Sequence, residues 1–235
     1  MTGAAIKTSR GLPGLIEAGY AGLLRRLKLH CGVEFFHIFR RELSPGQDIP
    51  DDVHNEYQFC RLDVSELITA AGEPKLELQP EKIRAAADRG DLFFGVYSGK
   101  ELVAYRWYGV DRPVPCENGL LLEFSAPGRA YGYRTFTRPD YRGRRLHLHS
   151  TRDADTRLAK LGVVHAVGYI SARNLPSLRS NARLPGVDRV GLITVLRFGS
   201  VTRVFSSRGA KAAGVRMTVD PKRGDIRGRF QEGSA

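Results

Sequence analysis

The sequence predicts a single domain with a mixed α/β (α+β) fold, in which helices flank one mixed sheet. Segments with helical spacing alternate with segments of strand character, and a hairpin pattern lies near the middle of the chain. No proline- or serine-rich linker and no repeat of about 20–50 residues divides the chain. We therefore expect one domain over residues 1–205, followed by a basic, partly flexible tail over residues 206–235.

The first expected helix is amphipathic and covers residues 13–30, because apolar residues recur there at spacings of three and four while the basic residues fall largely off that stripe. Such a stripe usually packs on its own domain. A strand over residues 34–41 follows. Residues 44–60 are polar and contain turn residues, so we expect a connection without regular structure.

Two further helices are expected before the hairpin. Asp63 suits the N-cap position and Glu66 the capping-box position of a short helix that Gly72 closes. Another helix begins after Pro80 and runs to Gly90. Both carry apolar residues at helical spacing, which predicts that each buries one face.

The hairpin is predicted from two aromatic and β-branched segments, residues 92–97 and 101–110, on either side of Ser98-Gly99. Residues 111–118 contain two prolines and an asparagine and are expected to form a loop. Residues 120–125 are expected to form a strand or a strand fragment.

A long strand over residues 131–138 comes next, because polar and aromatic residues alternate there. The helix after it begins near Leu146 and ends at Gly162. One face of this helix is expected to carry Thr151, Ala154, Leu158 and Leu161.

The last elements are expected to be a strand, a short helix and terminal strands. Residues 163–170 are mostly apolar and predict a buried strand. Asn174 is a favourable cap for a helix over residues 174–184. Residues 190–205 supply one or two strands around Gly199.

The most informative segment is residues 138–145, which read Arg-Pro-Asp-Tyr-Arg-Gly-Arg-Arg between a strand and a helix. A turn in this position presents unpaired backbone N–H groups, the positive end of a helix dipole and guanidinium groups at one place. The sequence therefore predicts an anion site, and phosphate is the expected ligand.

The distribution of charge agrees with this prediction. The net charge is +12, and residues 129–183 hold twelve Arg or Lys against three Asp or Glu. Residues 206–235 hold seven against three, so these two segments carry the whole excess. The first surrounds the anion turn, which favours a positive field that attracts a polyanionic ligand or an acidic partner.

Composition restricts the class of protein further. No segment approaches the roughly 20 apolar residues of a membrane span, and residues 1–10 lack the apolar core of a signal peptide. Three widely spaced cysteines suit a reducing cytoplasm, which is the expected location. His147 and His149 are two residues apart on a helix and make a poor metal pair, and no metal-binding motif is present, so we expect no metal.

The order of elements and two motifs resemble the GNAT superfamily of acyl-CoA N-acyltransferases. In that superfamily a turn of the form Arg/Gln-x-x-Gly-x-Gly/Ala follows the central strand, and here it corresponds to residues 142–147. An Asn and a Ser three apart begin the next helix in many members, which Asn174 and Ser177 match. The resemblance covers residues 80–205 well. It implies a GNAT-like fold with a central, mixed, largely antiparallel twisted sheet flanked by helices.

The resemblance also implies a function and a set of site residues. The chain is expected to be an N-acyltransferase that moves an acyl group, acetyl above all, from acetyl-CoA or another acyl-CoA to a primary amine by direct attack. Backbone groups of the strand are expected to hydrogen-bond to the pantetheine amides of the donor. The turn and the two residues Asn174 and Ser177 are expected to bind the rest of the donor. The implied donor-binding residues are Phe136, Thr137, Arg142, Gly143, Arg144, Arg145, Leu146, His147, Asn174 and Ser177.

The chain departs from the superfamily pattern at three positions. Arg145 and His147 stand where the motif prefers small residues, and Asn181 stands where a tyrosine often acts as general acid. Positions in a first helical turn have negative φ, so we expect no backbone penalty at Arg145, which can add a charged contact to phosphate. The general acid that protonates the departing thiolate is then water or another residue.

The proton of the attacking ammonium needs a base, commonly a carboxylate that acts through water. The candidates are Glu123, whose pKa apolar neighbours could raise, and Tyr133 on the central strand, with His147 as a third. Each has an ordinary structural role as its alternative, as a solvated or a packed residue.

Two other interpretations remain open. The donor can be an acidic acyl carrier protein, which a basic surface attracts and whose phosphopantetheine lacks the ADP moiety. The chain can instead be a non-enzymatic RNA-binding protein that stacks bases on Tyr131, Tyr133 and Phe136, although no recognised RNA motif is present. For the enzyme, the expected acceptor is a small-molecule amine such as an amino sugar, and a homodimer is a further expectation.

Overall fold

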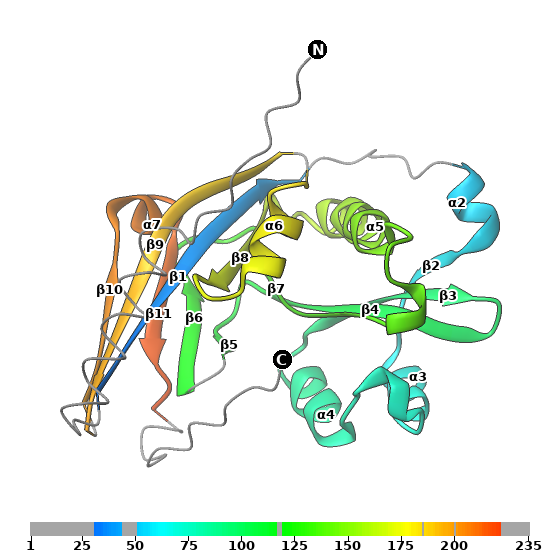
Figure 1. Cartoon of the computed structure of the whole chain (residues 1–235), viewed down its shortest axis with the longest axis horizontal. Helices are drawn as coiled ribbons and strands as arrows, with labels where there is room; N and C mark the ends of the chain where they lie inside the picture. Colours follow the sequence, from blue (N-terminus) through cyan, green and yellow to red (C-terminus); the bar gives the residue numbers. More distant parts are fainter. Residues whose placement is uncertain (1–30, 44–50, 117–118, 185, 200, 222–235) are drawn as a thin grey trace. The chain divides into compact units, whose positions relative to one another are not determined.

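The computed structural model describes residues 31–43, 51–116, 119–184, 186–199 and 201–221, so the helix expected over residues 13–30 lies outside the described residues. The elements are shown in Figure 1. In chain order they are β1 (Cys31–Glu42), α2 (Asp51–Glu56), β2 (Gln58–Arg61), α3 (Val64–Ala70), η1 (Pro74–Leu76), α4 (Pro80–Asp88), β3 (Leu92–Ser98), β4 (Glu101–Val110), β5 (Val114–Pro115), β6 (Leu120–Phe124), β7 (Arg129–Thr137), η3 (Pro139–Tyr141), α5 (Leu146–Lys160), β8 (His165–Ser171), α6 (Leu175–Asn181), β9 (Val187–Phe198), β10 (Val201–Ser206), α7 (Arg208–Ala212) and β11 (Val215–Val219).

The chain divides into two compact units. The first unit contains the residues up to 39, residues 115–123 and the residues from 169 onward, and the second contains residues 40–114 and 124–168. Strands β1 and β8 each contribute residues to both units. The expectation of one domain over residues 1–205 stays a prediction.

The second unit is built on a largely antiparallel sheet in the order β8-β7-β4-β3-β2. The pairs β2–β3, β3–β4 and β4–β7 are antiparallel, and only β7 and β8 are parallel. The predicted hairpin is the β3–β4 pair, and Gly99 at its turn has a φ of 58° that favours glycine. The predicted class, a mixed fold with a largely antiparallel sheet and flanking helices, is confirmed.

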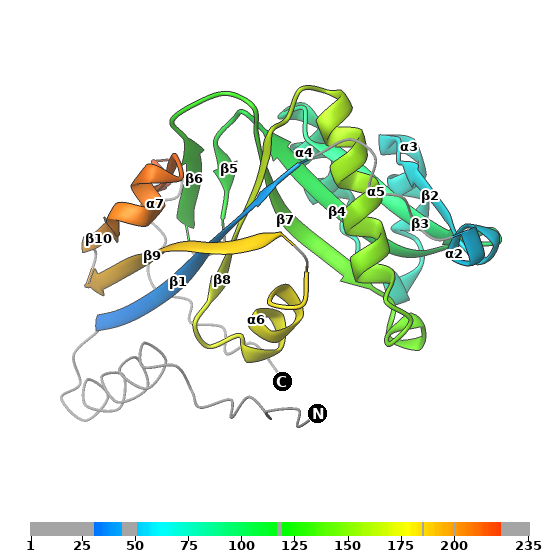
Figure 2. The ribbon, with the colours of Figure 1, turned by 90° about the horizontal axis from the view of Figure 1, so that it is seen from above.

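Helices cover both faces of this sheet, with α5 on one face and α3 and α4 on the other (Figure 1). Figure 2 shows α5 lying across the strands β4 and β7. The α5 face buries Phe94 and Tyr108 together with Ala154 and Leu158 of the helix. The opposite face buries a larger cluster, which includes Leu62, Leu67, Leu76, Leu78, Ile83, Ala86, Phe93, Leu102, Tyr105 and Trp107.

Local capping signals were predicted correctly. The backbone N–H of Asp63 donates to Oε2 of Glu66 at 2.6 Å, as a capping box requires at the start of α3. Oδ1 of Asn174 accepts a hydrogen bond from the backbone N–H of Ser177 at 3.1 Å at the start of α6. Each signal lies within four residues, so the chain's tertiary contacts are not needed to satisfy it.

In the first unit, β10, β9 and β1 are neighbouring strands, and β6 lies beside β11. The segment expected to be a tail instead forms α7 and β11, and Ala210, Val215 and Met217 are buried there. That prediction is wrong up to Pro221, because one small residue and two alternating apolar residues give too little periodicity to recognise. Residues 222–235 lie outside the described residues.

Two other expectations need correction. Within residues 44–60, the structure forms α2 and the edge strand β2 instead of an irregular connection, because β2 gains its hydrogen bonds from β3, far along the chain. Leu161 follows the end of α5 and is 58% exposed, so it does not belong to the buried face of that helix. No helix within the described residues is long and apolar enough to cross a membrane.

Candidate anion site at the start of α5

The turn between β7 and α5 has a defined backbone path. The single 3₁₀ turn η3 follows Arg138, and Arg142 then returns to an extended conformation with φ −69° and ψ 156°. Gly143 has a φ of 83°, which favours glycine. Leu146 begins α5 and is 1% exposed in a core with Val96 and Val103, so it fixes the start of the helix against the sheet.

The residues between these anchors face solvent. Arg142, Gly143, Arg144 and Arg145 are all exposed. Among the described residues, no acceptor is hydrogen-bonded to the backbone N–H groups of residues 143–147. These donors lie at the positive end of a 15-residue helix. The turn predicted from the sequence therefore has the donors that an anion needs.

The four arginines of the turn differ in their partners. Arg138 is 6% exposed and pairs with Asp140 at 2.6 Å and with Glu101 at 3.1 Å. Arg144 donates to the Tyr57 hydroxyl at 3.1 Å and lies 4.8 Å from the centre of the Tyr141 ring. These contacts shape the turn.

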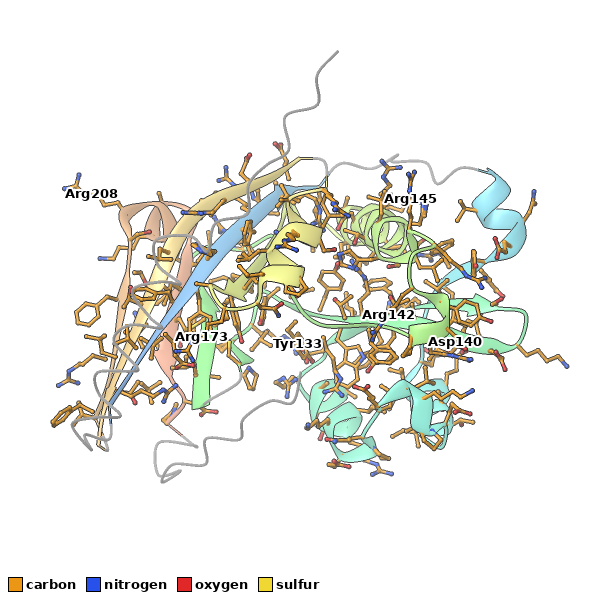
Figure 3. All side chains as sticks on the ribbon, viewed as in Figure 1. Tyr133, Asp140, Arg142, Arg145, Arg173 and Arg208 are labelled. Atoms are coloured by element: carbon orange, nitrogen blue, oxygen red, sulfur yellow. The ribbon has the colours of Figure 1, made fainter. Side chains whose placement is uncertain are left out.

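Arg142 and Arg145 are the two arginines of the turn that are left to bind an anion. Arg142 donates through Nε to the carbonyl oxygen of Thr137 at 3.2 Å, which is a neutral partner. Within the described part of the chain, Arg145 has no carboxylate within ion-pair distance. Figure 3 shows Arg142 and Asp140 at the turn and Arg145 at the start of α5. Two exposed guanidinium groups next to free amides are suited to phosphate oxygens.

The backbone at Arg145 corrects one prediction. Its φ is 59° and its ψ is 16°, a left-handed conformation, whereas the sequence analysis expected a negative φ and no penalty. Arg145 is the N-cap of α5 and lies outside the helix proper, so the negative φ of helical residues is not required of it. A non-glycine residue in this conformation is strained. The motif that this turn resembles has glycine at the same place.

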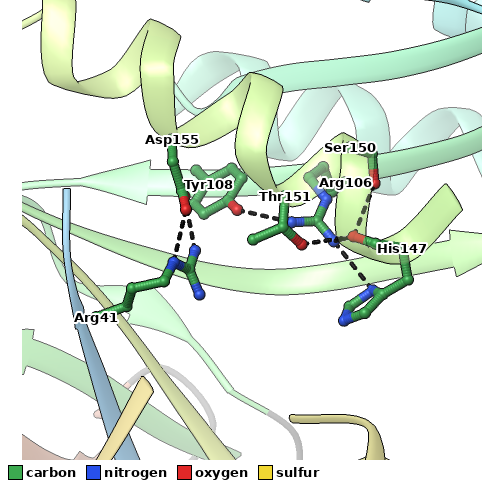
Figure 4. Close-up of polar contacts among 7 residues, drawn as sticks. All are labelled: Arg41, Arg106, Tyr108, His147, Ser150, Thr151 and Asp155. Atoms are coloured by element: carbon green, nitrogen blue, oxygen red, sulfur yellow. Dashed lines mark hydrogen bonds and ion pairs between the residues drawn. The ribbon is translucent and has the colours of Figure 1, made fainter. Parts of the chain in front are cut away.

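His147 lies in the first turn of α5 and points toward β4. Its Nδ1 is 3.1 Å from Nη2 of Arg106, a buried residue of β4. Arg106 also donates through Nη1 to the Tyr108 hydroxyl at 3.0 Å (Figure 4). Burial first, and then the charges of Arg106 and Arg41, lower the pKa of His147 to about 3. The imidazole is therefore neutral at physiological pH, which makes it a poor candidate for proton exchange.

Tyr133 lies on the other face of the sheet, against the cluster beneath α4. Its hydroxyl donates to Oδ2 of Asp91 at 2.7 Å, and Arg89 donates to both of these oxygens at 2.6 and 3.1 Å. Burial, and after it the carboxylate of Asp91, raise the pKa of the Tyr133 phenol. A phenol in these surroundings is a weaker base candidate than the sequence alone indicated.

The edge of β7 that faces β8 is only partly paired. The parallel ladder covers Arg129–His165, Ala130–Ala166 and Tyr131–Val167, while β7 continues to Thr137. Beyond Tyr131, the described residues of β8 give β7 no further paired partner. Phe136 and Thr137, whose backbone groups were expected to pair with the pantetheine amides, lie in this stretch. The Phe136 ring stacks on Tyr105, with 5.4 Å between ring centres.

The remaining predicted residues belong to the first unit. Glu123 is near the end of β6, and its Oε2 lies 3.5 Å from Nε of Arg216, a largely exposed pair. Asn174 caps α6, and Ser177 supplies the N–H that this cap receives. The described residues contain no group of three or more His, Cys, Asp or Glu that could hold a metal.

Sequence reasoning missed the polar group around Arg106. Arg41 comes from β1, Arg106 and Tyr108 from β4, and Asp155 from α5, so only the fold brings them together. One signal was available: Arg106 is the single charged residue in an apolar and aromatic run between Leu102 and Tyr108.

Comparisons with known protein families and with curated proteins find no match. Solved structures with some similarity include a protein from Drosophila, which is 14% identical with a TM-score of 0.47. That alignment covers 77% of this chain and 58% of the Drosophila protein. A protein from Novosphingobium aromaticivorans, described as an acetyltransferase of the GNAT family, is 18% identical with a TM-score of 0.49 and coverages of 81% and 80%. A GCN5-related N-acetyltransferase from Kribbella flavida is 15% identical with a TM-score of 0.46 and coverages of 84% and 67%.

Proposed function

We propose that the chain is an N-acyltransferase that transfers an acyl group, acetyl above all, from acyl-CoA to a primary amine. In this reaction the amine nitrogen attacks the thioester carbonyl carbon, the C–S bond breaks and the thiolate leaves. The nitrogen gives up a proton to a base and the thiolate gains one. Binding and orientation of the two substrates supply much of the acceleration in such a step.

One observation carries the proposal: at the exposed turn before α5, the backbone N–H groups and the two arginines Arg142 and Arg145 have neither a backbone acceptor nor a carboxylate partner, respectively, among the described residues. Backbone N–H groups at a helix N-terminus and guanidinium groups both bind pyrophosphate oxygens. In this proposal Arg142 and Arg145 bind oxygens of the pyrophosphate, and the backbone N–H groups of residues 143–147 bind its remaining oxygens. Phe136 and Thr137 offer backbone groups to pantetheine.

The same proposal assigns the remaining roles. Asn174 and Ser177 belong to the donor site through the motif they share with the resembling superfamily. Glu123 is the proposed base, acting through water, in preference to Tyr133, whose hydroxyl is committed to Asp91. Glu123→Gln is then expected to lower kcat while leaving donor affinity unchanged, and an unchanged kcat would argue against this role.

The structure disfavours the RNA-binding alternative. Base stacking needs exposed aromatic faces. Tyr131 is 3% exposed, Tyr133 is bound to Asp91 and Phe136 is stacked on Tyr105, so these rings are already packed. An acyl carrier protein as donor uses the same turn for its phosphopantetheine phosphate, and it is tested alongside CoA.

The test is thermal unfolding of the full chain with CoA, acetyl-CoA, acyl carrier protein or a short RNA. A ligand at about a hundredfold over its dissociation constant adds about 2.7 kcal/mol to the free energy of unfolding. We expect CoA to stabilise the wild type and Arg142→Ala to weaken its binding about tenfold or more. Arg157→Ala is the matched control, because this arginine lies near the other end of α5 and pairs with Asp153. Stabilisation by RNA alone would refute the proposal.

A further inference from the structure

A buried polar group beneath α5 carries more positive than negative charge. Asp155 of α5 binds Arg41 through two hydrogen bonds of 2.6 Å each, so this pair is neutral. Arg106 is 4% exposed and hydrogen-bonds the hydroxyl of Tyr108 and the ring of His147. Among the described residues no carboxylate pairs with Arg106. One positive charge therefore has no neutralising partner in the part of the chain that the structure describes.

Arg106 also has an unused donor. Its Nε is buried and makes no hydrogen bond within the described residues. A buried cation without a counter-charge is costly, and so is a buried donor without an acceptor. Proteins keep such groups where a bound ligand supplies the missing charge, or where the group holds a neighbour in place.

The geometry fixes the state of His147. An arginine only donates hydrogen bonds, so Nδ1 of His147 must accept from Nη2 of Arg106. The ring proton is then on Nε2, which makes Nε2–H a donor. His147 is only half-buried, whereas Arg106 and Tyr108 are buried, so a ligand reaches this group through the imidazole. Arg41 and His147 end on the same side of α5, with Arg106 and Tyr108 between them (Figure 4).

We infer that this group binds a substrate carboxylate, with Nε2–H of His147 as the donor that touches it and Arg106 as the buried counter-charge. The inference rests on the proposed function and deepens it. His147 follows the phosphate-binding turn by two residues, and Arg106 is paired in the sheet with Thr135 of β7, beside Phe136, so a second anion at this place lies next to the proposed donor-binding edge of β7. The carboxylate is carried either by the acyl group or by the amine acceptor.

Two matched pairs of probes distinguish these sources. Succinyl-CoA and butyryl-CoA have acyl chains of equal length, and only the first ends in a carboxylate. L-phenylalanine and L-phenylalaninamide, added with CoA present, differ in the same way on the acceptor side. We expect the carboxylate to improve affinity about tenfold or more in one of the two pairs, since a hydrogen bond to a charged group contributes about 1.5–3 kcal/mol.

Substitution of Arg106 tests the counter-charge. Arg106→Met is expected to abolish the preference for the carboxylate while melting no lower than the wild type, because an unneutralised buried cation is replaced by an apolar side chain. Arg138→Met is the matched control: Arg138 is equally buried but has two carboxylate partners, so its loss is expected to lower the melting temperature. His147→Ala, at a half-buried position, is expected to reduce the preference at least fivefold.

Three outcomes would overturn the inference: equal affinity within both probe pairs for the wild type, an unchanged preference in His147→Ala, or an Arg106→Met variant that melts further below the wild type than Arg138→Met. The last would show that Arg106 is structural. Failure of CoA itself to stabilise the wild type is a different result, and it would refute the proposed acyltransferase function instead.

Discussion

Arg145 offers a test in which the backbone conformation alone determines the sign of the effect. Its φ of 59° and ψ of 16° place it in the left-handed region. An L-residue with a side chain costs about 1–2 kcal/mol there. Glycine adopts this region freely but loses roughly 0.5–1 kcal/mol more conformational entropy on folding. Arg145→Gly is therefore expected to stabilise the protein by about 0.5–1 kcal/mol, or roughly 2 °C in melting temperature.

The useful comparison is between Arg145→Gly and Arg145→Ala. Both variants lose the guanidinium group, but only glycine removes the strain, since alanine keeps a Cβ at positive φ. The difference between their melting temperatures therefore measures the strain less the extra entropy that glycine loses, without a contribution from charge. Both are expected to bind CoA about tenfold more weakly than the wild type, because each lacks one charged contact to phosphate.

Arg144 is the matched control for this comparison, because it is the preceding residue, is exposed and does not have a positive φ. At this position the order is expected to reverse, with Arg144→Ala more stable than Arg144→Gly by roughly 0.5–1 kcal/mol. An Arg145→Gly variant no more stable than Arg145→Ala would refute the assignment of strain. So would the same order of stability at both positions.

Three other predictions concern single residues. Burial and nearby arginines hold the pKa of His147 at about 3, below its ordinary 6.5, so between these values only the unfolded chain protonates this ring. As the pH falls through this range, its contribution should lower the stability measured by urea unfolding by up to about 1.4 kcal/mol per pH unit. His147→Gln should remove that contribution and leave those of His37 and His165, whose pKa values burial also lowers. Tyr133→Phe is expected to lower stability by about 1–2 kcal/mol and kcat by less than tenfold. A loss of kcat near a hundredfold would instead indicate that Tyr133 acts as the base. Gly209→Ala should lower the melting temperature strongly, since a Cβ there would collide with the carbonyl oxygen of Val190. Gly168→Ala, with open space at its Cβ, should not, and equal behaviour of the two variants would contradict the packing of α7 on β9.

The parts of the fold predicted correctly depend on signals that are local in sequence. The capping box at Asp63 and Glu66, the hairpin at Gly99 and the cap at Asn174 each join residues a few positions apart. β2 is different, because its four residues become a strand only beside β3. The stability of such a strand comes from its partner, which no window of sequence contains.

The candidate site divides in the same way. The turn was predicted from its residues because glycine, arginine and a helix start are local properties. The left-handed Arg145 was not, since a φ depends on how the chain must turn to bring Leu146 into the core. The charge around Arg106 was missed for a further reason: whether a buried arginine is neutralised depends on Arg41 and Asp155, which lie on other elements.

The start of α5 concentrates two features that oppose folding, a strained backbone and a buried charge. Arg145 is strained, yet its guanidinium is exposed and has no carboxylate partner among the described residues. Arg106 is buried, and no carboxylate in the described ranges pairs with it, yet it touches the half-buried ring of His147, two residues from Arg145. Residues retained at such a cost are concentrated at binding sites. A phosphate at Arg145 and a carboxylate at His147 would bind different groups, so the stabilisation by a carboxylate-bearing substrate should add to that by CoA.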